Sequence, residues 1–578
     1  MIKKITAAFL SVLLIFSAAA CAPTLTESPL QTGSISENTP APSLPTPSPE
    51  PDFPDYPEEK ISLTNLSEYV IVYPSYYNEY RMNEVKLLQS TIKNVTGAEL
   101  EIISDGEQAH EHEIIFASSK RQNGVEESIS MFESGLDYVV GALNGNIILG
   151  GNNFYADMRA VYDYINNYLG YNDIDNIYSE PQSEVSGVNL HIYQKPLLTI
   201  MASNYSVSAF TEQYAIRDMH DACFNMTMVE AGAYSKDELI DLVKWCARYE
   251  IFLIMRSIRF VDEYTDCPII WGHTVRDEPH VKDYIMYSQQ CEDYAEKYSQ
   301  YGWHPWVNYM GWPQYWPMLN ETESLFDAVP VVSFDRYFGE NILQESELLE
   351  IFEYMRDLAQ RKGQEMWSYI ESYNITNRGQ NTSKMLRWSA YVSLCFGARG
   401  ILYFQYGDCS PNYTAEGDWT KGSLVNWDYT KNQAWYDAKT TNEELLKLAQ
   451  IYTQYETVGA HVINRKAKDT SVYLEDQYPY VSDFISDFKA SDDAIKNTYL
   501  LSLFEKTYGY GKAVILMNLE DIDDIPYEED EAEYVKIKLN CENPVFYRNG
   551  EPQNVEKDSD GYYVLNMANG YCWFITLD

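Results

Sequence analysis

The pattern of hydrophobic and polar positions is most regular between residues 196 and 460, where short apolar runs alternate with amphipathic stretches. Eight of the runs have the length and composition of buried strands. They occupy residues 197–203, 224–230, 251–257, 269–275, 305–310, 328–334, 365–370 and 400–405. Helical spacing separates most of them, as in 236–249, 281–300, 345–362 and 383–396. Alternating strands and helices in this number predict a (β/α)8 barrel, with an open doubly wound sheet as the alternative.

A smaller domain is predicted before the barrel, over residues 59–195. It contains a stretch with helical spacing at 81–95 and a second one at 156–169. Between them, two apolar runs flank Asn144-Gly145, and such a pair between two runs is the strongest short signal for a β-hairpin. Strands and helices in this mixture predict a small α/β domain.

The chain after the barrel, residues 461–578, has a different pattern. Its apolar runs come in pairs that are separated by turn residues. The runs at 499–504 and 513–518, for example, flank Gly509-Tyr510-Gly511. We expect a C-terminal antiparallel β-sandwich.

The first 58 residues predict export and anchoring rather than folded structure. A short basic start and an apolar run at 5–16 precede small residues and Cys21, which resembles the lipobox of a bacterial lipoprotein. The apolar run is too short to span a membrane. Residues 22–58 are rich in Pro, Ser and Thr and predict a disordered linker. We expect lipidation at Cys21 and a lipid-anchored, extracytoplasmic location on the bacterial cell surface; an ordinary cleaved signal peptide is the alternative.

Composition and charge exclude several classes of partner. The formal net charge of -44 argues against nucleic acid and against adsorption on anionic lipid, because both need clustered Lys and Arg. The nine cysteines are widely spread, without a Cys-x-x-Cys pair, so few or no disulfides are expected. Neither a nucleotide-binding loop nor a metal-ligand spacing is present in the sequence, and no cofactor or metal is expected.

Carboxylates follow three of the predicted barrel strands. Asp277 and Glu278 follow the fourth, Asp335 the sixth and Glu371 the seventh. Active sites of such barrels lie at these strand ends, and strands four and seven face each other across the barrel. Cleavage of a glycosidic bond needs two carboxyl groups, one of which donates a proton. Glu278, close to Trp271 and Asp277, is the expected proton donor, with Glu371 as its partner and Asp335 as the competing second carboxylate.

The same residues carry a family resemblance. The barrel resembles clan A of the glycoside hydrolases, which includes the family 42 and family 35 β-galactosidases. In that clan an Asn-Glu-Pro type motif follows strand four, and the nucleophilic Glu follows strand seven. The resemblance implies that Glu278 is the acid/base and Glu371 the nucleophile. The Asn of the motif, which binds the sugar 2-hydroxyl, is replaced by Asp277, so that binding role and the substrate stay open.

Two further stretches resemble known enzymes. The run ARGILYFQYGD, residues 398–408, resembles the last barrel strand of the same clan. The run GNIILGGNNFYADMRAVYDYINNYLGY, residues 145–171, resembles the N-terminal accessory domain that precedes the barrel in α-glucuronidases and β-hexosaminidases.

Aromatic and polar residues near the strand ends are expected to contact a sugar, because flat rings with polar tips stack on sugar rings. The expected contacts are Trp271, His273, Asp277, Tyr309, Trp312, Asp335, Tyr337, Trp367, Tyr369, Tyr403 and Gln405.

The sequence therefore predicts a glycoside hydrolase that acts on an extracellular oligo- or polysaccharide, with a retaining mechanism. Two alternatives stay open: an inverting, α-glucuronidase-like enzyme in which Asp335 helps as base, and a non-catalytic glycan-binding lipoprotein on a degenerate barrel. The separation of the carboxyl groups distinguishes the two mechanisms, at about 5–5.5 Å for retention and roughly 6.5–9.5 Å for inversion.

Overall fold

The computed structural model describes residues 52–203, 213–310, 325–337, 345–372, 383–408, 423–426, 428–463, 481–490, 498–519, 534–567 and 572–577. All of them belong to one compact unit, Pro49–Asp578. Cys21, most of the predicted linker and Trp312 lie outside the described residues. Within the described residues, none of the helices is both long and apolar enough to cross a membrane.

The N-terminal part is an α/β domain, as predicted. Its six-stranded sheet has the order β10-β5-β6-β4-β2-β3. The strands are β2 (Val70–Tyr73), β3 (Glu101–Ser104), β4 (Glu113–Phe116), β5 (Tyr138–Leu143), β6 (Asn146–Gly150) and β10 (Val188–His191). The helices are α1 (Met82–Thr96), α2 (Glu126–Ser130) and α3 (Phe154–Asp163). Short ladders pair β1 (Lys60–Ser62) with β9 (Glu184–Ser186), and β7 (Tyr171–Asn172) with β8 (Ile177–Tyr178).

The predicted hairpin of this domain is confirmed. Strands β5 and β6 pair in antiparallel fashion. Asn144 and Gly145 join them with φ angles of 54° and 78°. Two successive left-handed residues are what a two-residue hairpin turn requires, which explains why Asn and Gly occupy these positions.

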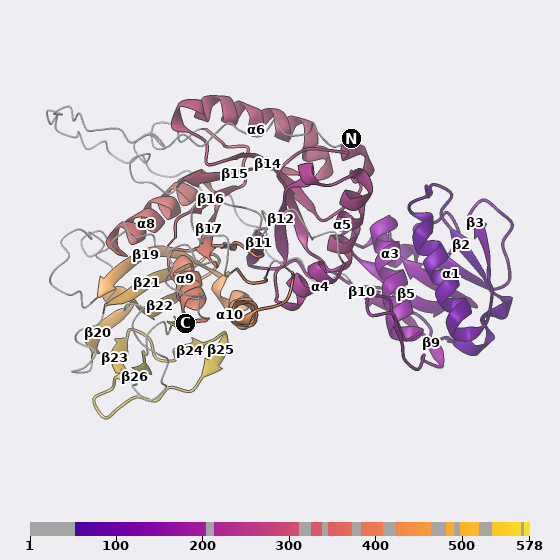
Figure 1. Ribbon diagram of the computed structural model, residues 1–578. Coiled ribbons are helices and arrows are strands. Elements are labelled where there is room, and N and C mark those ends of the chain that lie inside the picture. The colour runs from indigo at the N-terminus through magenta and orange to yellow at the C-terminus, as the bar shows by residue number, and fades with distance from the viewer. Residues whose placement is uncertain are drawn as a thin grey trace. The chain divides into compact units, whose positions relative to one another are not determined.

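The central part is a closed barrel of eight parallel strands, and this confirms the predicted fold class (Figure 1). The strands are β11 (Thr199–Ser203), β12 (Met226–Val229), β13 (Phe252–Met255), β14 (Ile270–Asp277), β15 (His304–Met310), β16 (Val331–Asp335), β17 (Glu365–Glu371) and β18 (Gly400–Phe404). Each overlaps one of the predicted runs. The barrel helices are α4 (Gln213–Asp221), α5 (Lys236–Arg248), α6 (Tyr284–Tyr298), α8 (Glu345–Lys362), α9 (Ser383–Cys395) and α10 (Gln433–Tyr452).

Two antiparallel sheets follow the barrel, as predicted. The larger has the order β19-β21-β22-β27-β24-β25, and the smaller has the order β20-β23-β26. Their strands are β19 (Tyr455–Ile463), β20 (Ile485–Ala490), β21 (Tyr499–Lys506), β22 (Lys512–Asn518), β23 (Tyr534–Leu539), β24 (Val545–Arg548), β25 (Glu551–Gln553), β26 (Tyr563–Asn566) and β27 (Cys572–Thr576). One apolar cluster joins the sheets and includes Leu501, Ile537 and Leu565. The boundary predicted at residue 461 falls inside β19.

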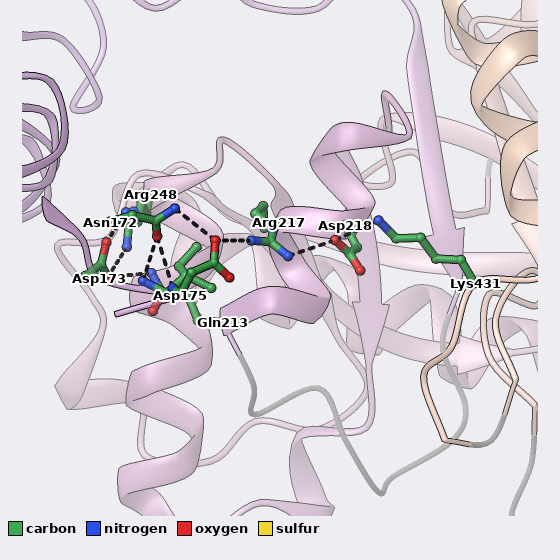
Figure 2. Close-up of polar contacts among 9 residues, drawn as sticks. Asn172, Asp173, Asp175, Gln213, Arg217, Asp218, Arg248 and Lys431 are labelled. Atoms are coloured by element: carbon green, nitrogen blue, oxygen red, sulfur yellow. Dashed lines mark hydrogen bonds and ion pairs between the residues drawn. The ribbon is translucent and has the colours of Figure 1, made fainter. Parts of the chain in front are cut away.

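Charged contacts connect the N-terminal domain with the barrel. Arg248, the last residue of α5, donates two hydrogen bonds of 2.8 Å to Asp173, in the turn between β7 and β8. Both side chains are more than nine-tenths buried. On α4, Asp218 lies 3.5 Å from Arg217 and 3.0 Å from Lys431, which precedes α10 (Figure 2). The turn of the N-terminal domain thus packs on a polar network that includes two barrel helices.

Candidate active site

Polar side chains gather where the barrel strands end. Because the strands are parallel and the barrel is closed, the carboxyl ends of all eight lie at one end of the barrel. The polar residues at or just beyond these ends are Ser203, Glu230, Arg256, Asp277, Glu278, Asn308, Asp335, Arg336, Glu371 and Gln405.

Glu278 follows β14 directly and has an unusual backbone conformation. Its φ angle is +48°, in the left-handed region that costs a non-glycine residue free energy. Its backbone N–H donates to the carbonyl oxygen of Asn308 on the neighbouring strand, at 2.9 Å. This bond extends the β14–β15 ladder, which pairs Asp277 with Asn308, by one residue. Strained backbone of this kind persists only where the surrounding structure holds it in place, and it clusters at functional sites.

The Asn308 side chain joins two carboxyl groups. It is 3% exposed, and its amide Nδ2 donates to Asp335 Oδ1 at 2.8 Å and to Asp277 Oδ1 at 3.4 Å. Its own oxygen accepts a hydrogen bond of 2.9 Å from Ser333 Oγ. The amide is therefore oriented by a hydroxyl on one side and presents its N–H groups to the carboxylates on the other.

The carboxyl group of Asp335 interacts with that of Glu278. Two ionised carboxylates are acceptors only, so close contact between them is favourable only when one of them carries a proton. Burial, followed by the charges of Glu278 and Asp277, raises the pKa of Asp335 well above its ordinary value, while the hydrogen bond from Asn308 opposes the rise. The pair consequently retains a proton at a pH where an exposed carboxyl group is ionised.

Asp277 has a different environment, because a cation compensates its charge. Arg256, which follows β13, donates from Nη2 to Asp277 Oδ2 at 3.4 Å. The Nε atom of the same arginine lies 4.0 Å from Glu230, which follows β12. Asp277 is thus held between the guanidinium of Arg256 and the amide of Asn308.

Glu371 is the last residue of β17 and is 8% exposed. Its strand is the seventh of the barrel and lies three strands from β14. The hydroxyl of Tyr369, two residues earlier on the same strand, accepts a hydrogen bond of 3.1 Å from Ser203 Oγ. Tyr337, which lies just after β16, stacks on Phe404, the last residue of β18, with ring centroids 5.9 Å apart. Aromatic side chains from both neighbouring strands therefore approach the end of β17.

Three of the expected sugar contacts pack toward the barrel helices. The Nδ1 atom of His273 lies 2.6 Å from the hydroxyl of Tyr294 on α6, and burial lowers the pKa of His273 to about 4. Tyr309 packs edge-on against another tyrosine of α6. The hydroxyl of Tyr403 donates to Asn442 Oδ1 on α10 at 2.7 Å. These contacts lie on the outer surface of the barrel, so the three side chains point away from the strand-end site.

The two tryptophans among the expected contacts lie near the other end of the strands. Trp271 is the second residue of β14, and Trp367 is the third residue of β17. Their rings are 5.3 Å apart, and Trp271 also contacts His304, the first residue of β15, at 5.1 Å. This pair therefore lies away from the carboxyl ends of the strands. Asp277, Asp335, Tyr337, Tyr369 and Gln405 stay with the two glutamates at the carboxyl ends.

Arg256 and Asn308 also lie at the site, although neither was among the residues expected from the sequence. The signal was present: both are polar residues inside or at the end of a predicted strand, and a polar group in a buried strand needs a partner. Among the described residues, no group of three or more His, Cys, Asp or Glu side chains can hold a metal ion.

Comparison with known proteins gives matches among solved structures only. No protein-family model and no curated protein matches the chain. A β-galactosidase from Halorubrum lacusprofundi is 12% identical, with a TM-score of 0.31 over 43% of this chain and 58% of that one. CpGH84D is 13% identical, with a TM-score of 0.34 over 70% and 73% of the two chains. Xylanase 10B from Thermotoga maritima is 12% identical, with a TM-score of 0.31 over 43% and 96%.

These structural neighbours include glycosidases. The present chain spans 58% of the length of the Halorubrum enzyme. At such identities and TM-scores the likeness does not bear on activity, and the chemistry of this chain has to follow from its own strand ends.

Proposed function

We propose that this protein is a glycoside hydrolase in which Glu278 donates the proton to the leaving oxygen. The observation that carries the proposal is the group of carboxyl side chains at the carboxyl end of the barrel, where Glu278 interacts with the buried Asp335 and Glu371 ends β17. An acid catalyst must hold its proton near neutral pH, and a second carboxylate in contact with it favours the protonated form. The left-handed backbone of Glu278 agrees with a residue that is held in position for a reaction.

Asp335 does not fit the role of the carboxylate on the far side of the scissile bond. The carboxyl group of Asp335 interacts directly with that of Glu278. Catalytic pairs are separated by about 5–5.5 Å in retaining enzymes and by more in inverting ones, because the sugar, or the sugar and a water, lies between them. The second group therefore comes from another strand, and Glu371 at the end of β17 is the proposed nucleophile.

The proposed reaction is a double displacement with retention. Glu371 attacks the anomeric carbon while Glu278 protonates the departing oxygen, so that the carbon–oxygen bond breaks and a glycosyl-enzyme ester forms. Glu278, now ionised, removes a proton from a water molecule that cleaves the ester. Asp277, Tyr337, Tyr369 and Gln405 are the proposed contacts to the hydroxyl groups of the sugar.

The proposed substrate is an extracellular oligo- or polysaccharide, and this part rests on the sequence. The apolar run before Cys21 supports export and lipid anchoring to the bacterial cell surface. Replacing Cys21 with Ser should abolish metabolic labelling with a fatty acid and release the protein from the membrane fraction. Labelling that persists in the variant would rule out the anchor.

The function is tested with a panel of aryl glycosides and natural oligosaccharides. We expect the wild type to release sugar from at least one member, and Glu278→Gln to reduce kcat by about 10²–10⁴-fold. Glu292→Gln, on the exposed face of α6, is the matched control and should keep full activity. If the wild type hydrolyses none of the panel but binds a member of it, the protein is a glycan-binding module and not an enzyme.

A further inference from the structure

We propose that the pocket lined by the N-terminal domain and by the barrel helices α4 and α5 binds a neutral saccharide, with Asn166 and Arg217 as its polar contacts. The pocket has a volume of about 620 Å³, which lies within the range of about 300–1,000 Å³ that is usual for small-molecule sites. The inference goes beyond the proposed function, because it concerns a second binding site that takes no part in breaking the bond.

Three elements supply the walls of the pocket. Asn166 lies in η2 (Tyr164–Tyr168), the turn that extends α3, and the hairpin of β7 and β8 forms the second wall. Arg217 of α4 and Arg248 of α5 belong to the third. Because α5 leads into the amino end of β13, the pocket lies away from the carboxyl ends of the strands, where Glu278 is placed.

The turn that carries Asn166 is a π-helix. The backbone N–H of Leu169 donates to the carbonyl oxygen of Tyr164, five residues earlier in the chain, at 3.0 Å. Single turns of this kind within longer helices are rare and are frequent at functional sites. The backbone therefore departs from the α-helix at the point where the side chain of Asn166 lines the pocket.

Two buried polar atoms at the pocket have no hydrogen-bond partner among the described residues. They are the side-chain oxygen of Asn166 and the Nε atom of Arg217. A buried polar atom without a partner costs free energy, so each such atom needs an explanation. The oxygen needs a donor and the Nε–H needs an acceptor. A hydroxyl group can serve as either, whereas a carboxylate cannot donate and an ammonium group cannot accept. A ligand with several hydroxyl groups satisfies both atoms.

The charges around the pocket disfavour an acidic ligand. Each arginine that lines it is paired with a carboxylate. The pairs are Arg159 with Glu250, Arg248 with Asp173, and Arg217 with Asp175 and Asp218. Figure 2 shows Arg217 between its two aspartates. Because these positive charges are already compensated, a carboxylate or phosphate group would lose its hydration in the pocket without gaining a free cation in the described part of the chain.

Apolar side chains complete the lining. Ile174 and Ile177 line the pocket from the β7–β8 hairpin, and Ile177 is 59% exposed. Tyr162 also belongs to the lining, and the guanidinium carbon of Arg248 lies 3.8 Å from the centroid of its ring. Small-molecule sites combine such apolar walls with a few hydrogen-bonding groups. The C–H faces of a sugar ring placed against Ile177 would remove its apolar surface from water.

The binding test is titration calorimetry with four neutral probes, maltotriose, cellotriose, mannotriose and xylotriose, and with trigalacturonate as the acidic probe. The parent protein for this test is the full chain with Glu278→Gln, so that no probe is hydrolysed. We expect at least one neutral trisaccharide to bind, and trigalacturonate to bind more weakly. If no neutral probe binds, or if trigalacturonate binds more tightly than all of them, the inference is overturned.

Substitutions in the pocket distinguish this site from the proposed active site. Asn166→Ala removes the free acceptor, and Arg217→Lys keeps a charge beside Asp175 and Asp218 but lacks the Nε–H. Each should weaken binding of the neutral trisaccharide by about tenfold or more. Asn83→Ala, at an exposed position on α1, is the matched control and should bind like the parent. If either pocket substitution leaves the affinity unchanged, the inference is wrong.

Thermal unfolding separates a binding role of Asn166 from a structural one. Without ligand, Asn166→Ala should unfold at the same temperature as the parent or at a higher one, because the oxygen that it removes is buried without a partner. A saturating concentration of the bound trisaccharide should raise the midpoint of the parent and leave that of Asn166→Ala almost unchanged. A lower midpoint of the ligand-free variant would show that Asn166 stabilises the fold, and it would overturn the assigned role.

This inference and the proposed function can fail independently. If the trisaccharide binds in the pocket but the wild type hydrolyses no glycoside, the binding site stands and the proposed activity is lost. If the wild type hydrolyses a glycoside but the pocket substitutions do not change the affinity for any trisaccharide, the activity stands and the second site is lost.

Discussion

The backbone N–H of Glu278 donates to the carbonyl oxygen of Asn308 at 2.9 Å, and Glu278 adopts a left-handed conformation in making this bond. The same asparagine donates from its side chain to Asp335, whose carboxyl group interacts with that of Glu278. One residue of β15 thus fixes both the backbone position and the electrostatic environment of the proposed acid.

The left-handed backbone of Glu278 predicts how the stability of variants at this position depends on the side chain. Glycine adopts a left-handed conformation without the cost that a Cβ atom imposes, which is about 1–2 kcal/mol. We therefore expect Glu278→Gly to be more stable than Glu278→Ala by roughly 1 kcal/mol, measured by urea unfolding, although both are inactive. Equal stabilities of the two variants would show that the conformation at this position carries no strain.

Glu371 provides a test of the stereochemical outcome. We expect Glu371→Ala to lose hydrolysis and to regain turnover of an activated aryl glycoside when azide is added, because azide replaces the missing nucleophile in the vacant space. NMR should detect a β-configured product first when the wild type acts on a β-glycoside. Release of the α-anomer would instead show an inverting enzyme, in which Glu371 activates water.

The contact between the N-terminal domain and the barrel should contribute measurably to stability. Arg248 and Asp173 are 7% and 8% exposed, and removing one member leaves the other charge buried. Such changes typically cost about 3–5 kcal/mol. We expect Arg248→Ala to lower the free energy of unfolding by about 3 kcal/mol. Lys60→Ala should leave it almost unchanged, because the Lys60–Glu184 pair is exposed. Similar effects of both substitutions would contradict the argument.

Asp157, on α3 of the N-terminal domain, predicts a pH-dependent stability. Burial raises its pKa to about 7, although Tyr77 and the backbone N–H groups of Ser118 and Gly151 donate to it. Between the ordinary carboxyl pKa and pH 7 the folded state binds more protons than the unfolded one, so stability falls as the pH rises, by up to about 1.4 kcal/mol per pH unit. Calorimetry between pH 4 and pH 7 measures the slope, which Asp157→Asn should reduce.

The close packing of Gly150 against Asp157 predicts how substitutions at this glycine affect folding. Gly150 has a φ of +123°, and a Cβ atom added there would lie 1.8 Å from Asp157 Oδ1. Gly187 also has a positive φ, of +60°, but a Cβ atom there would meet no atom within 4 Å. We expect Gly150→Ala to prevent or strongly destabilise folding of the domain and Gly187→Ala to cost only about 1 kcal/mol. A mild effect at Gly150 would mean that the Asp157 site is more adaptable than its contacts indicate.

The directions of individual side chains could not be obtained from the sequence. Strands that are buried on both faces are apolar throughout, so the pattern does not reveal which face points into the barrel. His273 and Tyr403, expected to contact a sugar, pack instead against α6 and α10. A register irregularity between Thr274 and Arg276 also interrupts the alternation along β14, and no local pattern announces it.

The sequence by itself determined the order of strands and helices in the barrel, because buried strands and amphipathic helices differ in hydrophobic period and each run is a local property. It also determined that Asp277, Glu278, Asp335 and Glu371 follow strand ends. Only the tertiary structure decided which of these carboxyl groups meet. Asn308 and Asp335 are far apart in the chain from Glu278, and the three residues interact because the parallel pairing of β14 with β15 and of β15 with β16 places them side by side. The chemistry of the site depends on these contacts, since the pKa of a carboxyl group is set by what surrounds it in space.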